Sequence, residues 1–144
     1  MFKEMIAKNR ICFHESFPTW QDAVRASCQP LLAEGVITEE YIDANIKNVL
    51  EYGPYIVIAP NICIPHAQEG RGVNATAISF MRTAEPVHFS DDPEQDARLF
   101  FVLSSVDNDA HLLNLQALVE VVSDQDNVDV MLAATSVDDL TDLP

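Results

Sequence analysis

Residues 99–103, with the sequence LFFVL, form a continuous apolar run that narrows the folds open to this chain. A strand with one face in water alternates apolar and polar residues, whereas a run without polar positions is typical of a strand buried on both faces. A sheet containing such a strand needs other elements on each side. The run therefore favours an α/β sandwich, with helices packed against a central sheet.

Two amphipathic helices are expected ahead of this strand. The first should begin after Thr19, a good N-cap, and end at Gly35, with Pro30 bending or weakening its last turns. The second should begin after Thr38 and stop at Gly53. Apolar residues three and four apart predict the buried faces: Trp20, Val24, Cys28 and Leu31 in the first helix, and Tyr41, Ile42, Ile46, Val49 and Leu50 in the second.

The remaining elements alternate irregularly between helix and strand, which argues for a mixed sheet within one domain spanning residues 1–144. We expect a long helix after the caps at 107–109, with Leu112, Leu115, Leu118, Val119 and Val122 facing the core. Short helices are predicted at 2–8, 126–133 and 136–143, and strands at 10–13, 55–59, 62–64 and 75–81.

Charge excludes several classes of partner. The chain carries 23 acidic and 8 basic residues, for a formal net charge of -15, and its last basic residue is Arg98. Binding to nucleic acid or to an anionic membrane requires Lys and Arg, so neither is expected as a main partner. No apolar run reaches the roughly 18 residues of a membrane-spanning helix. An apolar content of 48% excludes a disordered acidic tail.

Cysteine usage points to the cytoplasm. Cys12, Cys28 and Cys63 are an odd number of cysteines without metal-binding spacing, and they are interpreted as reduced, mostly buried thiols. Residues 1–8 mix charged and apolar side chains and lack the core of a signal peptide.

Two of the four histidines have informative surroundings. His66 follows the apolar stub 62–64 and Pro65, so its ring should lie at the end of a strand, before the polar loop 68–72. His111 should lie in the first turn of the long helix, where unpaired N–H groups favour an anion such as a phosphoryl group. The competing interpretation of His66 is a solvated loop histidine, and that of His111 is a histidine that packs on the preceding strand. His14 and His88 have no comparable setting.

Other chemistries have weaker support. The acidic residues at 91–96 could bind a divalent cation, but a solvated turn is the favoured interpretation. Cys63 could pair with His66 as a nucleophile, although their spacing places them on opposite sides of a strand and favours a buried thiol. No phosphate-binding glycine loop, hydrolase serine motif or zinc-protease motif is present.

Residues 53–66, with the sequence GPYIVIAPNICIPH, resemble the active-site signature of enzyme IIA of the bacterial phosphoenolpyruvate-dependent sugar phosphotransferase system. The similarity is to the fructose–mannitol type (type 2), and the sequence of residues 53–60 is most similar to its ascorbate-type branch. It extends from residues 20–24 to residues 138–140 and places a histidine at position 111.

The resemblance implies a mixed five-stranded sheet flanked by helices on both sides. It implies that His66 takes a phosphoryl group from the phosphocarrier HPr and passes it to a cysteine of enzyme IIB, while His111 supports the phosphorylated ring. The membrane component IIC would be an indirect partner, the sugar would be ascorbate or a pentonate-like compound, and no cofactor or metal would be needed. Other branches use an arginine on the preceding helix, and here Lys47, Arg71 or no residue at all takes that role.

Two alternatives to a transport role stay open. Nitrogen-type relatives use the same site to regulate other proteins by binding them, and an unrelated small-molecule-binding domain would take up no phosphate. For a phosphoryl carrier we expect the carboxylates to lie away from the phosphate position, because they would repel it. The net negative charge would then serve to attract partners with basic faces.

Overall fold

The structure is a computed structural model that describes residues 1–67 and 71–144. Twelve elements follow one another along the chain, two of them short 3₁₀ turns labelled η. They are α1 (Phe2–Ala7), β1 (Ile11–His14), α2 (Trp20–Glu34), α3 (Glu39–Tyr52), β2 (Val57–Ala59), β3 (Asn61–Cys63), β4 (Ala77–His88), η1 (Pro93–Gln95), β5 (Asp96–Ser104), α4 (Asn108–Ser123), α5 (Gln125–Ala133) and η2 (Val137–Leu140).

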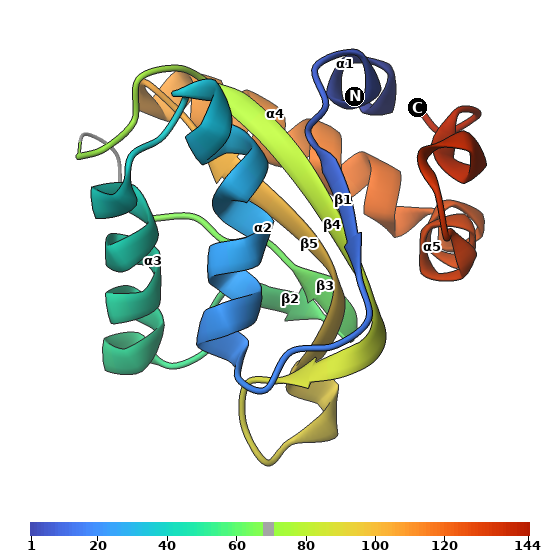
Figure 1. The fold of residues 1–144 in the computed structure, drawn as a ribbon, viewed down its shortest axis with the longest axis horizontal. Helices are drawn as coiled ribbons and strands as arrows, with labels where there is room; N and C mark the ends of the chain where they lie inside the picture. The colour runs from blue at the N-terminus through green and yellow to red at the C-terminus, as the bar shows by residue number, and fades with distance from the viewer. Residues whose placement is uncertain (68–70) are drawn as a thin grey trace.

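The five strands form one mixed sheet in the order β1-β4-β5-β3-β2. β1 pairs with β4 and β3 with β5 in parallel, whereas the β4–β5 and β2–β3 pairs are antiparallel. In Figure 1, α2 and α3 cover one face of this sheet, and α1, α4 and α5 lie on the other. The expected α/β sandwich with a mixed five-stranded sheet is confirmed.

The apolar run at residues 99–103 lies in the central strand β5, and none of its side chains is exposed to solvent. Phe100 and Val102 belong to the core beneath α2 and α3. The other three, Leu99, Phe101 and Leu103, belong to the core beneath α1, α4 and α5. The alternation confirms the prediction of a strand covered on both faces, and β5 contributes side chains to both cores.

The first amphipathic helix has the expected boundaries. The Thr19 hydroxyl accepts a hydrogen bond from the backbone N–H of Asp22 at 3.2 Å, and Gly35 ends the helix in the left-handed conformation, with φ of 81°. The helix continues past Pro30 to Glu34.

Three of the predicted core positions were wrong. Leu50 is 67% exposed, because the buried face of α3 ends at Val49. Leu112 and Val119 on α4 are 54% and 43% exposed, whereas Leu118 and Val121 are buried. Apolar residues surround much of α4, so their periodicity does not identify the face that meets the sheet.

Two further elements differ from expectation in extent. β4 runs to His88 rather than ending near residue 81, and it passes Pro86 where the β4–β5 register shifts between Arg82 and Val87. Such an irregularity tolerates a proline, which has no N–H for the ladder. The last predicted helix is the 3₁₀ turn η2, which has a capping box between Ser136 and Asp139.

Two arginines attach the end of α5 to the sheet. The Leu132 carbonyl accepts hydrogen bonds from Arg82 and Arg98, of which the shortest is 2.6 Å. No helix in the described part of the chain is both long and apolar enough to cross a membrane.

Candidate active site around His66 and His111

His66 lies just beyond the end of β3, at the edge of the sheet where β5 also ends. The chain leaves β3 through Ile64 and Pro65, whose backbone groups form hydrogen bonds with neighbouring segments. The Ile64 N–H donates to the Ile56 carbonyl at 2.7 Å, and the Leu103 N–H donates to the Pro65 carbonyl at 3.1 Å. Pro65 has no N–H with which to continue the ladder, so the chain turns there and presents the ring of His66.

The half-buried His66 ring has a defined orientation. Its Nδ1 lies 2.6 Å from the carbonyl oxygen of Ile64, which can only accept a hydrogen bond. Nδ1 therefore carries the proton, and Nε2 has the free lone pair. Burial lowers the pKa of His66, the Ile64 carbonyl opposes this shift, and nearby His111 adds to it. The ring is therefore held neutral with a nucleophilic Nε2.

His111 lies in the first turn of α4, next to His66. The Asp107 carboxylate caps this helix by accepting from the Ala110 N–H at 2.7 Å. The rings of His66 and His111 have centroids 5.5 Å apart, and their planes are 35° apart. The Ser105 hydroxyl lies 3.4 Å from His111 Nδ1. The structure thus brings together the two histidines singled out from the sequence, which are 45 positions apart.

Two tyrosines hold the peptide that follows His66. Tyr55 donates its hydroxyl proton to the His66 carbonyl at 2.7 Å, and its ring packs edge-on against the imidazole. The hydroxyl of buried Tyr41 accepts from the Ala67 N–H at 3.2 Å and donates to the Leu103 carbonyl at 2.6 Å. Sequence reasoning had placed Tyr41 only in the core. A signal was available, because a buried tyrosine hydroxyl usually needs a hydrogen-bond partner.

A cavity of about 420 Å³ opens beside the His66 ring, and no carboxylate is among its described lining residues: Asn48, Tyr52, Tyr55, His66 and Ala67. The expectation that acidic side chains avoid the phosphate position stays a prediction, because Glu69 lies outside the described residues. Asn48 and Tyr52 are the α3 residues in this lining, whereas the two basic candidates, Lys47 and Arg71, are not part of it. Lys47 is exposed, and Arg71 is 3.9 Å from Glu40 with most of its side chain in solvent.

The polar loop predicted at residues 68–72 is described only from Arg71 onward, since 68–70 lie outside the described residues. The returning chain is attached to the start of α3, where the Thr38 N–H donates to the Gly72 carbonyl at 2.9 Å. Gly72 has φ of 80°, and a Cβ there would lie 2.6 Å from the Thr38 hydroxyl oxygen. This close approach requires glycine.

The remaining candidates lie away from this site or lack reactivity. Cys63 is completely buried, and burial raises the pKa of its thiol well above the ordinary value, which contradicts the idea of a Cys63–His66 nucleophile pair. His88 contacts the Asp96 carboxylate at 2.8 Å. Among the described residues, no three histidine, cysteine or acidic side chains are grouped as metal ligands. In the acidic segment at 91–96, Asp91, Asp92 and Glu94 are exposed to solvent.

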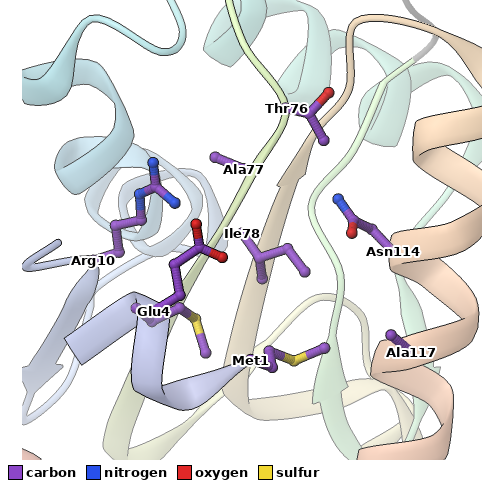
Figure 2. A pocket seen from close by; sticks show the side chains of 9 residues that line it. Met1, Glu4, Arg10, Thr76, Ala77, Ile78, Asn114 and Ala117 are labelled. Atoms are coloured by element: carbon purple, nitrogen blue, oxygen red, sulfur yellow. The ribbon is translucent and has the colours of Figure 1, made fainter. Parts of the chain in front are cut away.

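A second cavity, of about 370 Å³, lies in the gap between α1 and α4 over β4 (Figure 2). Its lining includes Met5, Ile78 and Asn114 but no histidine. The guanidinium of Arg10, which also lines it, is engaged by Glu34 through two hydrogen bonds of 2.7 and 2.8 Å. Of the two candidate histidines, His66 lines the first cavity, and neither lines this second one.

Comparison with known proteins agrees with this geometry. The family model described as "Phosphoenolpyruvate-dependent sugar phosphotransferase system, EIIA 2" matches residues 4–143. The chain belongs to this family. It is thus a phosphoryl-carrier component of a sugar phosphotransferase system, and a phosphotransferase by class.

Individual relatives place it within the family. The chain is 28% identical over 143 residues to the ascorbate-specific IIA component of Escherichia coli K12, covering 98% of this chain and 93% of the relative. It resembles the solution structure of CmtB, a mannitol-specific cryptic enzyme IIA of E. coli, with a TM-score of 0.88, 30% identity, and 98% and 95% of the two chains covered. It shares its fold, with a TM-score of 0.79 and 21% identity over 91% of this chain and 90% of the other, with E. coli mannitol IIA in its complex with phosphorylated IIB.

Proposed function

We propose that His66 of this IIA protein accepts a phosphoryl group from phospho-HPr and passes it to a cysteine of its cognate enzyme IIB. The observation that carries the proposal is the contact of His66 Nδ1 with the Ile64 carbonyl, 2.6 Å long. It leaves Nε2 as a neutral nucleophile at the end of a strand, beside an open cavity.

The chemistry follows from this tautomer. The Nε2 lone pair attacks the phosphorus, and the bond between phosphorus and the donor nitrogen breaks with its electron pair moving to the donor. The ring becomes cationic as the new bond forms, and the Ile64 carbonyl next to Nδ1–H offsets that charge. In the second transfer, a thiolate of IIB attacks the same phosphorus and Nε2 leaves as a neutral ring.

His111 is proposed to stabilise the transferring phosphoryl group. Three oxygens carry negative charge during the transfer, so catalysis consists of positioning and electrostatics. The ring of His111 is 5.5 Å from that of His66, and the N-terminal turn of α4 adds a positive dipole end. Asn48, on the α3 side of the cavity, can donate its amide to an oxygen without bringing a negative charge.

The partners and the sugar are inferred from relatives. Mannitol IIA of E. coli has a structure in complex with phosphorylated IIB, which supports IIB as the acceptor here. The name of the ascorbate-specific relative supports ascorbate as the transported sugar. A pentonate-like compound as the sugar, and a membrane IIC component as indirect partner, are proposed from the resemblance of residues 53–66. A carrier that works between HPr and IIB would be located in the cytoplasm.

A purified relay tests the proposal. The chain is incubated with phosphoenolpyruvate, enzyme I and HPr, and phosphate incorporation is followed with and without HPr. We expect one phosphoryl group per chain, labile in acid and stable in base, that requires HPr. Absence of incorporation while HPr itself is phosphorylated would contradict the proposal. Uptake without transfer to any IIB encoded near the gene would favour the regulatory, nitrogen-type role instead.

A further inference from the structure

The peptide unit between His66 and Ala67 is held at both of its polar ends by tyrosine hydroxyls. Tyr55 donates to the carbonyl of this unit at 2.7 Å, and the N–H of the same unit donates to Tyr41 at 3.2 Å. The two hydroxyls come from different segments, Tyr41 from α3 and Tyr55 from the chain between α3 and β2. A peptide unit is planar, so fixing both ends fixes its orientation.

Tyr41 also connects this unit to the central strand. Its hydroxyl donates to the Leu103 carbonyl at 2.6 Å, and the Leu103 N–H donates to the Pro65 carbonyl at 3.1 Å. The residues on either side of His66 are therefore both attached to one residue of β5. Burial raises the pKa of Tyr41 to about 12, so the phenol keeps the proton that it donates.

The position of Tyr41 separates it from any partner protein. Its side chain is 2% exposed, and the cavity beside His66 is lined by other residues. A docking protein or a phosphoryl oxygen therefore has no access to it, in contrast to Tyr55, which is 39% exposed. Any effect of the Tyr41 hydroxyl on transfer must pass through the backbone at His66.

We propose that Tyr41 and Tyr55 are positioning residues that lock the His66–Ala67 peptide and thereby aim Nε2 of His66 for phosphoryl transfer. The inference rests on His66 being the phosphorylated residue. Small displacements of a reacting group have large effects on rate, so loss of either hydroxyl slows transfer, and for buried Tyr41 this effect can pass only through the backbone. Because both act on one rigid unit, their effects are not independent.

The test compares Tyr41→Phe, Tyr55→Phe and the double variant with Ser79→Ala. The control removes a buried hydroxyl that donates to the Ser27 carbonyl at 3.2 Å rather than to the His66–Ala67 peptide or to either tyrosine. With phospho-HPr as the donor, Tyr41→Phe should lower kcat for uptake roughly tenfold with little change in KM. The double variant should be less impaired than the product of the two single effects. Ser79→Ala should keep the wild-type kcat.

A second set of measurements tests whether the tyrosines hold the His66–Ala67 peptide, and it does not require phosphoryl transfer. Hydrogen exchange at the Ala67 amide should be faster in Tyr41→Phe, and ¹⁵N spectra of the His66 ring should show a larger share of the other tautomer, whereas Ser79→Ala should change neither. If wild-type protein took up no phosphate, the proposed function would be wrong, yet these spectra would still show whether the tyrosines orient the His66–Ala67 peptide. Wild-type kcat in Tyr41→Phe, or a loss confined to KM, would overturn the positioning role. If Tyr41→Phe failed to fold, Tyr55→Phe and its tautomer ratio would decide the question.

Discussion

His66 and His88 each have Nδ1 within 3 Å of an oxygen atom, but the charge around the two rings differs. At His66 the oxygen is the Ile64 carbonyl, 2.6 Å away, and at His88 it is the Asp96 carboxylate, 2.8 Å away. The cavity beside His66 is lined, among described residues, by neutral side chains. The one beside His88 includes Asp91 and Asp96, and the His88 side chain is 72% exposed.

Under the proposed assignment of His66, orienting an imidazole is not enough by itself to build a phosphoryl site. An incoming phosphoryl group is anionic, and carboxylates next to His88 repel it, whereas the described lining of the cavity beside His66 contains no carboxylate. The second imidazole of His111 and the start of α4 are also found only beside His66, within the described residues. Substitutions that remove parts of this difference should slow the uptake of phosphate.

Removing each ring should have opposite consequences. His66→Ala should abolish phosphate incorporation from phosphoenolpyruvate, enzyme I and HPr, because it removes the nucleophile. His88→Ala should incorporate phosphate like the wild type. Circular dichroism of both variants controls for folding. Incorporation of phosphate by His66→Ala at the native rate and stoichiometry would show that His66 is not the phosphorylated residue.

Loss of the neighbouring imidazole should have the next largest effect. His111→Ala should slow uptake roughly a hundredfold, the order of magnitude seen when one stabilising donor is removed from an active site. Rapid-quench measurement of uptake and of onward transfer to IIB gives both rates. Unchanged rates in the two directions would show that His111 has no part in the transfer.

Introducing a carboxylate should make the His66 cavity resemble the surroundings of His88. Asn48→Asp should slow uptake roughly tenfold at low salt, because a charge within a few ångströms opposes the phosphoryl group. Lys47→Gln lowers the net charge by the same amount at an exposed neighbouring position, and is the matched control. Equal slowing in both variants would mean that overall charge, and not its location, matters.

Acid should slow uptake with a midpoint below the ordinary pKa of histidine. Burial lowers the pKa of His66 from the usual value of 6.5, so more than half of the rings are still neutral and nucleophilic at that pH. The uptake rate should therefore fall to half at a pH below 6.5, in parallel with the NMR titration of the His66 ring. A midpoint above 6.5 in either measurement would contradict this electrostatic description.

Salt should have the smallest effect. With a net charge of -15, the chain should attract partners with basic faces, so the second-order rate of uptake from phospho-HPr should fall a few-fold as salt is raised. Stopped-flow measurements at several ionic strengths give this dependence. A rate that does not change with salt would remove electrostatic attraction from the account, and the role of His66 would stand.

Local patterns were enough to predict the layers of the fold and the two histidines. The apolar run at 99–103 indicated a strand covered on both faces, and the caps before α4 placed His111 at a helix start. By contrast, Tyr41 reaches Leu103 across 62 positions and Ala67 across 26, and no local period contains such contacts. The same limit explains the error at Leu112, because the face of α4 that meets the sheet is chosen by tertiary packing.

The central claim is that a neutral His66, with its proton on Nδ1, attacks phosphorus through Nε2. Two-dimensional ³¹P and ¹⁵N NMR of the phosphorylated protein, with ¹⁵N-labelled histidine, identifies the nitrogen that carries the phosphoryl group. The account predicts one phosphoryl group per chain, bonded to Nε2 of His66, with the proton retained on Nδ1. A phosphoryl group on Nδ1 of His66, or on any other residue, would contradict it.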